Sequence, residues 1–440
     1  MGLFPAIAAN MLQMVGVGPF LTIPLILSTM HGPQALAGWI LGALIALCDG
    51  LVWAELGAAM PGTGGSYEYL QQAFGPHSLG RPMGFLFLWQ VMLAAPLTAA
   101  SGGVGFADYA RYLFPSMTPL EHTFLAVAVC LAATVLLYRN IRSIGTISTI
   151  LWIGLMLAMA VIIWGGAWHF QWKIAFDFPP GAFKLSGAFF VGLGGATLIS
   201  MYDYSGYFTV CLIGGEIKNP TVTIPRAILL SIGVLAVLYV AMSLSIIGVL
   251  PWQEAAQSKA IVSDFMAHLY GSKAATWMTC LILWVAFASV FCVLLGFTRV
   301  PYAAAAEGRF FSAFARVHPT QHFPTFSVIF MGVLSASACF LTLEQLIKEL
   351  IIVQILTQFA AQCVAVVLLR RYRTNIPRPF SMPLYPLPVL VALAGWLYIL
   401  VSSGAAYVLI GLAMLALGVG AYLWRAKSLG EWPWERMTAV

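Results

Sequence analysis

Long apolar stretches separated by short polar segments recur along the chain from Ala6 to Trp424. A helix needs about 20 apolar residues to cross a hydrocarbon core about 30 Å thick, and it satisfies its backbone hydrogen bonds internally. The pattern therefore predicts an all-α integral membrane protein of about twelve transmembrane helices. The predicted spans cover residues 6–29, 35–59, 83–110, 121–138, 145–168, 185–215, 225–250, 274–298, 325–341, 346–369, 387–402 and 405–424.

The composition is consistent with lipid as the solvent of this chain. Of its 440 residues, 61% are hydrophobic and 8% are charged, whereas soluble domains carry about 25% charged residues. No basic residue precedes the first span and no small-residue cleavage site follows a short apolar core, so we expect no cleaved signal peptide.

Lysine and arginine are distributed unequally between the two sides of the predicted layout. With the N-terminus in the cytoplasm, 15 of the 21 lie on the cytoplasmic side: Arg81, Arg139, Arg142, Lys218, Arg226, Arg299, Arg309, Arg316, Arg370, Arg371, Arg373, Arg378, Arg425, Lys427 and Arg436. The other side holds Arg111, Lys173, Lys184, Lys259, Lys273 and Lys348. Because cytoplasmic loops are enriched in these residues, we expect a multi-pass protein of the cell membrane with both termini in the cytoplasm. The net charge of +6 is then a topology signal, and no basic run suggests nucleic-acid binding.

The cysteines and histidines do not point to a metal or a cofactor. All seven cysteines lie inside predicted spans, where a thiol behaves as a small hydrophobe, so we expect no disulfides. The seven histidines lie at span ends or in loops and lack metal-ligand spacing. The sequence predicts neither a metal site nor a cofactor.

The first predicted span contains a segment that should open the helix near the middle of the membrane. It consists of Val15, Gly16, Val17, Gly18, Pro19 and Phe20. Pro19 has no backbone N–H and disfavours helical geometry at Gly18, while the two glycines permit unwinding. The alternative is a proline kink whose small residues allow close helix packing.

The sixth predicted span is interrupted by polar residues. Within an otherwise apolar stretch it contains Tyr202, Asp203, Tyr204, Ser205, Gly206 and Tyr207. An aspartate at the centre of a span costs about 3 kcal/mol on insertion scales, so Asp203 should face a cavity or a partner. The alternative is an aspartate that packs between helices and bonds to a neighbouring hydroxyl.

Interrupted helices at spans 1 and 6 are typical of inverted-repeat transporters. Each break exposes a half-helix N-terminus, which suits a carboxylate, and free carbonyls, which suit an ammonium or a cation. A zwitterion matches both. We expect one transmembrane domain over residues 1–424, with repeats near 6–168 and 185–369, further spans near 387–424, and a cytoplasmic tail at 425–440.

Several motifs resemble the family of amino acid, polyamine and organocation transporters. Besides the glycine-rich break, they are PGTGGSY at 61–67, GEIKNP at 215–220 with IPR at 224–226, RVPYAAA at 299–305 with EG at 307–308, and RPF at 378–380 with PLYP at 383–386. The motif after span 6 is highly specific. The resemblance covers nearly the whole chain.

The resemblance implies a five-plus-five inverted repeat of the leucine-transporter type, with alternating access and a substrate held between the two breaks. The backbone of Val15, Gly16, Val17, Gly18 and Pro19 would bind the carboxylate end and part of the amine. Tyr202, Tyr204, Ser205 and Gly206 would supply carbonyls and a gating ring, with Tyr202 as the aromatic gate. The segment 253–270 has apolar residues at helical spacing, as a lid or a plain surface helix would.

Two departures from the family pattern lie at the first break. Pro19 stands where a small residue is usual, so one N–H donor is missing, and Phe20 replaces a frequent glycine. Proline is tolerated at the first position of a helix, so the half-helix can still begin there. This variant looks like the branch that includes polyamine transporters, and Asp203 could pair with a substrate cation.

A third departure concerns the coupling ion. Many proton-coupled relatives carry a lysine in span 5, but residues 143–172 contain no lysine or arginine. Asp203 and Asp49 are then the candidates for proton coupling, whereas Glu55, near a cytoplasmic end, has a structural role. A sodium site would need Ser289, the hydroxyl in the middle of span 8.

The leading hypothesis is a secondary amino acid transporter, either proton-coupled or an exchanger. The alternative within the same class is a polyamine or other cationic amine transporter. From other classes, a membrane-embedded enzyme lacks any recognisable catalytic or nucleotide-binding motif, and a channel fits broken helices less well than a closed binding site. Trp89, Pro96, Phe287 and Gln358 lie on the pocket-forming spans 3, 8 and 10, but periodicity does not decide which of them face inward.

Overall fold

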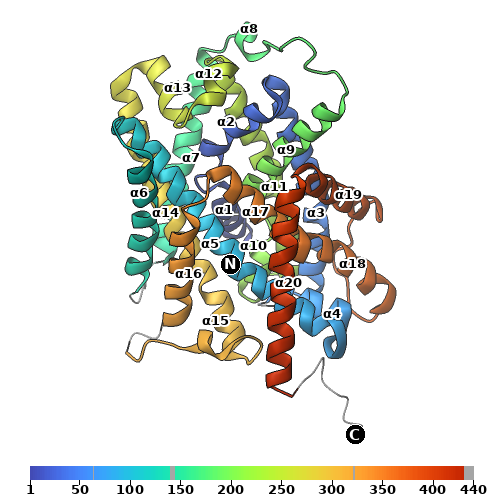
Figure 1. The fold of residues 1–440 in the computed structure, drawn as a ribbon. Helices are drawn as coiled ribbons and strands as arrows, with labels where there is room; N and C mark the ends of the chain where they lie inside the picture. Colours follow the sequence, from blue (N-terminus) through green and yellow to red (C-terminus); the bar gives the residue numbers. More distant parts are fainter. Residues whose placement is uncertain (63, 139–143, 321–322, 431–440) are drawn as a thin grey trace.

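The computed structural model describes residues 1–62, 64–138, 144–320 and 323–430 (Figure 1). Of the residues used in the predictions above, Thr63, Arg139, Arg142 and Arg436 lie outside the described residues, as does the predicted tail beyond residue 430.

The regular structure of the described residues is helical, so the prediction of an all-α protein is confirmed. The helices are α1 (Leu3–Val15), α2 (Pro19–Met30), η1 (Pro33–Leu36), α3 (Ala37–Ala59), α4 (Ser66–Phe74), η2 (Gly75–Leu79), α5 (Gly80–Leu113), α6 (Pro119–Leu137), α7 (Ile144–Trp168), α8 (Trp172–Ala175), α9 (Gly187–Tyr204), α10 (Thr209–Leu212), η3 (Gly214–Glu216), α11 (Pro220–Ile247), α12 (Trp252–Gln257), α13 (Ile261–Tyr270), α14 (Ser272–Phe297), α15 (Arg299–Ala306), η4 (Ser312–Ala315), α16 (Thr325–Ala338), α17 (Leu343–Gln354), η5 (Ile355–Phe359), α18 (Ala360–Tyr372), α19 (Leu387–Ser402) and α20 (Ala405–Ser428). Val317 and Pro324 form an isolated antiparallel bridge.

The described residues contain seven helices that are long and apolar enough to cross a membrane, and the bent pair α1 and α2 makes an eighth. The helices α16, α19 and the part of α7 from Trp152 to Trp168 are apolar but shorter. The count of about twelve spans and the five-plus-five repeat therefore stay predictions.

The helices form one bundle with small helices at its two ends. In Figure 1, α8, α12 and α13 lie at one end and α4 and α15 at the other. We call these ends the α12–α13 face and the α4–α15 face. Between them, α3 packs against α9 and α11, and α5 packs against α6, α14 and α17. The two groups have separate apolar cores, and the site described below lies where they meet.

Local sequence explains where two of the spanning helices begin. At the start of α6, Thr118 accepts from the backbone N–H of Glu121, whose side chain accepts from the Thr118 backbone. Thr342 and Gln345 make the same reciprocal pair at the start of α17. Such capping boxes satisfy N–H groups that the first helical turn leaves free.

The first predicted interruption is confirmed between α1 and α2. Gly16 has a φ of 43°, a value that favours glycine, and Pro19 opens α2 at its first turn, where the missing N–H does no harm. The axes of the two helices differ by 52°. Helical backbone thus stops at Val15 and resumes at Pro19.

The second predicted interruption is confirmed after α9, but the chain beyond it is less helical than expected. The helix ends at Tyr204, and Gly206 has a φ of 117°. Instead of a half-helix reaching residue 215, α10 is only 4 residues long and leads into η3. Gly214 and Gly215 follow directly after α10 and Pro220 lies a few residues further on, and these residues disfavour a longer helix.

Candidate functional site

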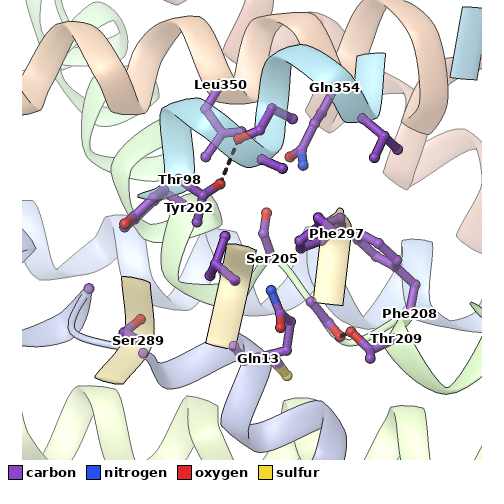
Figure 2. Close-up of a pocket in the computed structure, with 18 of the residues that line it drawn as sticks. Gln13, Thr98, Tyr202, Ser205, Phe208, Thr209, Ser289, Phe297, Leu350 and Gln354 are labelled. Carbon is purple, nitrogen blue, oxygen red and sulfur yellow. Dashed lines mark hydrogen bonds between the residues drawn. The ribbon is translucent and has the colours of Figure 1, made fainter. Parts of the chain in front are cut away.

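A cavity lies between the two interruptions. Its volume is about 900 Å³ including the part open to solvent. The lining residues are Gln13, Met14, Val15, Gly16, Val17, Gly18, Phe87, Gln90, Val91, Ala94, Ala95, Thr98, Gly102, Tyr202, Ser205, Gly206, Phe208, Thr209, Leu212, Ser289, Val293, Phe297, Val300, Leu350, Gln354 and Gln358. Figure 2 shows Gln13 and Gln354 extending into this space from opposite sides, with Ser205 between them.

The structure brings most of the predicted site residues to this cavity, but not all of them. The lining includes Val15, Gly16, Val17, Gly18, Tyr202, Ser205, Gly206 and Ser289. The remaining candidates Pro19, Asp203, Tyr204 and Asp49 are not part of it. The role of every one of these residues in substrate binding or coupling stays a prediction.

The two interruptions touch each other at glycines. A Cβ atom added to Gly18 would lie 2.1 Å from Asp203 Oδ1, and one added to Gly206 would lie 2.8 Å from Gln13 Cγ. Real Cβ atoms do not approach other atoms so closely, so a side chain at either position would push the breaks apart. The contact explains why glycine is needed at both places.

Asp203 lies behind the cavity, in the contact between the two interruptions. One carboxylate oxygen accepts a hydrogen bond of 2.5 Å from the Thr22 hydroxyl of α2. The other oxygen has no partner among the described residues, and the side chain is 1% exposed. The Asp203 backbone carbonyl accepts from the Tyr239 hydroxyl at 3.1 Å. The neighbouring hydroxyl matches the packing alternative, while the unpartnered oxygen is unusual for a purely structural aspartate.

Tyr204 points away from the cavity, into the contact of α9 with α3 and α11. Its ring packs edge-on against Trp39 and tilted against Tyr239, with centroids 5.9 Å and 5.4 Å away. Its hydroxyl donates to the Trp39 carbonyl at 3.2 Å. Its side chain therefore packs between helices, whereas the Tyr202 ring is part of the cavity wall.

Asp49, on α3 and outside the cavity lining, binds the segment between α9 and α10. Its carboxylate accepts from the Tyr207 hydroxyl at 2.5 Å and from the Trp396 indole N–H at 3.2 Å. Cys363 lies within 3.7 Å of the same group. Since Tyr207 belongs to the stretch between α9 and α10, Asp49 ties that stretch to α3, α18 and α19.

Sequence reasoning missed Asn10, which caps the short helix α10. Its side-chain oxygen accepts from the backbone N–H of Val210 at 3.1 Å, and its amide nitrogen lies 3.4 Å from the Ser231 hydroxyl. An asparagine inside an apolar span was a signal that could have been used.

The polar part of the cavity wall was also largely missed. Gln13, Gln90, Thr98 and Gln354 line it together with Gln358, which alone of these was considered beforehand. Trp89 instead donates to the Met414 carbonyl of α20 at 3.0 Å, and Pro96 and Phe287 are outside the lining. Glutamines in apolar spans are a usable signal, but the sequence does not reveal which helix face meets the cavity.

Hydrogen bonds close the cavity toward the α12–α13 face. The Tyr202 and Ser101 hydroxyls are 2.7 Å apart. The Tyr109 hydroxyl donates to the Phe20 carbonyl at 2.8 Å and accepts from the Val262 N–H of α13 at 3.4 Å. Because Pro24 cannot donate to the Phe20 carbonyl within α2, Tyr109 satisfies a group that the helix leaves free.

The segment 253–270, predicted as a lid or a surface helix, forms α12 and α13 on this same face (Figure 1). The apolar side of α13 is buried at Ile261, Val262, Phe265 and Met266. The helix α13 packs against α14, and α12 packs against α2. At the other end the lining extends to Phe297 and Val300, where α14 passes into α15.

The helical fold and the cavity define a class: an all-α protein with a cavity between two interrupted helical segments. The sequence model of the family described as amino acid permease matches residues 1–433. The chain belongs to this family, within the amino acid, polyamine and organocation transporters, and is a multi-pass membrane protein.

Three relatives show the kinds of transporter to which the chain is similar. The chain is 26% identical to the serine/threonine exchanger SteT of Bacillus subtilis (strain 168), covering 95% of this chain and 96% of the relative. It is 27% identical to cationic amino acid transporter 4 of Mus musculus, covering 83% and 58%. It is 25% identical to the branched-chain amino acid permease BcaP of Bacillus subtilis (strain 168), covering 89% and 85%.

Proposed function

We propose that this protein is a secondary active transporter that moves a neutral amino acid across the cell membrane by alternating access. The observation that carries the proposal is the cavity between two interrupted helices, whose described lining contains no charged side chain. The similarity to an amino acid exchanger over nearly the full length of both chains supports the class of substrate. The same similarity argues against an enzyme.

The backbone of the interruptions suits the two charges of a zwitterion. The backbone N–H groups of Val17 and Gly18 have no hydrogen-bond partner among the described residues, so they are available to a carboxylate. The first turn of α2 is not, because its N–H groups bond back to the carbonyls of Val17 and Gly18 and Pro19 has none. The carbonyls of Met14 and Val15 at the end of α1, and that of Tyr204 at the end of α9, accept no hydrogen bond from the described residues and are available to an ammonium group. A substrate held this way would be bound mainly by Val15 to Gly18 and by Tyr202, Ser205 and Gly206.

A polyamine fits the cavity less well. A buried cation needs an opposite charge or a dense set of acceptors, and the Asp203 carboxylate lies outside the lining. The similarity to a cationic amino acid transporter keeps cationic substrates as the second candidate to be tested.

Asp203 is our candidate for the proton-coupling group. An unpaired carboxylate is costly to bury, and the described residues supply no salt bridge to it. A proton would neutralise it at the contact between the two interruptions, where a change in charge can alter how they pack. Sodium is the alternative ion. The Ser289 hydroxyl lies beside Gly16 at the first interruption, 3.0 Å from where a Cβ atom would stand, so it could bind a cation together with backbone carbonyls there.

The closed α12–α13 face and the extension of the cavity toward the α4–α15 face suit a state that opens to one side only. Under the positive-inside rule the α4–α15 face is cytoplasmic, so we assign the structure to an inward-facing state of one transmembrane domain spanning residues 1–424. A channel would need a continuous pore instead.

The test is ligand binding by the detergent-purified protein. Thermal unfolding is measured with neutral amino acids, cationic amino acids and polyamines, with and without sodium, at two pH values. A ligand at 100 times its dissociation constant stabilises the folded state by about 2.7 kcal/mol. We expect neutral amino acids to raise the unfolding temperature and to show counterflow in proteoliposomes. Stabilisation by di- or polyamines alone would favour the second candidate, and saturable flux without counterflow would contradict a carrier.

A further inference from the structure

We propose that Gln90 and Gln354 form a side-chain subsite that selects amino acids carrying a hydroxyl or carboxamide group. The proposal rests on the proposed function, because it assumes that the cavity binds a neutral amino acid by its backbone groups at the two interruptions. It adds which side chain that amino acid carries.

The two glutamines lie on the wall formed by α5 and α17. Gln90 is 2% exposed and Gln354 is 8% exposed, and both line the cavity. The side-chain carbonyl oxygen of each is buried without a hydrogen-bond partner among the described residues. In Figure 2 the amide of Gln354 points into the cavity, toward the side on which Gln13 and Ser205 lie.

Buried polar atoms in proteins nearly always have a partner. A third glutamine of the lining, Gln358 of η5, has one, because its amide donates to the Ser66 hydroxyl at 3.3 Å. Two unpartnered amide oxygens on one cavity wall therefore point to a ligand that brings the missing hydrogen-bond donor.

The position of the wall indicates which part of the ligand it meets. The carboxylate and ammonium groups of an amino acid suit the free backbone groups at the two interruptions, which belong to Val17, Gly18 and the ends of α1 and α9. The α5–α17 wall is formed by other helices, so it would face the substituent on the α-carbon.

The chemistry of the wall indicates the kind of substituent. A carboxamide donates and accepts hydrogen bonds, as does a hydroxyl, so either can pair with the glutamine amides. An aliphatic side chain would leave both glutamines unpaired, and polar sites of this kind discriminate strongly against such analogues. Acidic or basic side chains would find no opposite charge in the described lining.

Threonine and valine provide the test, because they have nearly the same shape and differ by one hydroxyl. Binding to the full-length purified protein is measured by thermal unfolding over a concentration series, and exchange by counterflow in proteoliposomes. We expect the wild-type protein to bind threonine about tenfold more tightly than valine, or more, and asparagine more tightly than leucine.

The variants Gln90→Met and Gln354→Met, alone and together, replace each amide by an apolar chain of similar length. We expect the threonine-to-valine affinity ratio to fall toward one, largely because valine binds better. Gln362→Met is the matched control. Gln362 is fully buried and both of its amide atoms lack a partner among the described residues, but it lies outside the lining, so the ratio should not change.

Equal binding of threonine and valine by the wild-type protein would overturn the subsite while leaving the proposed function intact. This measurement needs no variant, so it decides the matter even if a variant fails to fold. A wild-type ratio that survives in both folded variants would also overturn the assignment to these two glutamines. Failure of every amino acid to bind or exchange would instead refute the proposed function, and the subsite with it.

Discussion

At the scale of single residues, the contact between Gly18 and Asp203 joins the two interruptions. The Asp203 carboxyl group fits there because Gly18 has no side chain, and Thr22 supplies the one hydrogen bond that it makes with the described residues. The carboxyl group is adjacent to the cavity wall without being part of it. It is therefore placed to affect the packing of the breaks rather than to touch the substrate.

Substitution of Asp203 tests this interpretation. Asp203→Asn keeps the shape and one acceptor for Thr22 but cannot take up and release a proton. Counterflow of a neutral amino acid should persist, whereas uptake driven by a proton gradient should lose its enhancement, about 5- to 150-fold for a typical coupling free energy. Both are measured in proteoliposomes, with and without an imposed pH difference.

The control for this experiment is Asp108→Asn. Asp108 lies on α5, outside the cavity lining, and its carboxylate pairs with His122 of α6 at 3.0 Å. The substitution should leave the pH dependence unchanged. Loss of counterflow in a folded Asp203→Asn protein would mean that the carboxylate binds substrate or holds the structure together, and the coupling role would be wrong.

At the scale of elements, Tyr109 connects three of them on the α12–α13 face. It lies on α5, donates to α2 at Phe20 and accepts from α13 at Val262. The bond to Phe20 exists because Pro24 interrupts the hydrogen-bonding of α2. Closure of this face thus depends on a proline inside a helix and a tyrosine on another.

We expect Tyr109→Phe to weaken this closure. It leaves the Phe20 carbonyl buried without a partner, which costs about 1–3 kcal/mol. The unfolding temperature of the purified protein should fall, and hydrogen exchange in α13 should speed up. Tyr112→Phe removes a hydroxyl that makes no hydrogen bond among the described residues and should change neither. If exchange in α13 were the same in both variants, Tyr109 would not hold that helix in place.

At the scale of the whole molecule, the charged residues and the small helices define two different faces. The basic residues Arg299, Arg309 and Arg316 follow α14 on the α4–α15 face, whereas Lys173 and Lys184 lie in the connection from α7 to α9. The difference supports the predicted orientation, with the closed side of the cavity outside the cell.

Thiol labelling of intact cells tests this orientation. Lys184→Cys and Ala306→Cys place a cysteine at exposed positions near the two opposite faces. A membrane-impermeant maleimide should label position 184 in intact cells and position 306 only after permeabilisation. The protein without these substitutions gives the background from its native cysteines. The reverse pattern would show that the assigned orientation is wrong.

The sequence by itself determined the helical class, the place of both interruptions and the family motifs. These depend on local properties: the length of apolar stretches, the restricted backbone of Pro19, and the freedom of Gly16 and Gly206. The short length of α10 was not predicted from the sequence, although Gly214 and Gly215 disfavour a longer helix.

Only the tertiary structure decided which polar residues meet the cavity. Asp203 and Tyr204 follow Tyr202 directly, yet Tyr202 alone of the three is in the lining. Consecutive residues of a helix point about 100° apart, so the face turned toward a cavity depends on the packing of neighbouring helices. For the same reason Gln90 and Gln354, far apart in the chain, could be placed on one wall only once α5 and α17 had been packed together.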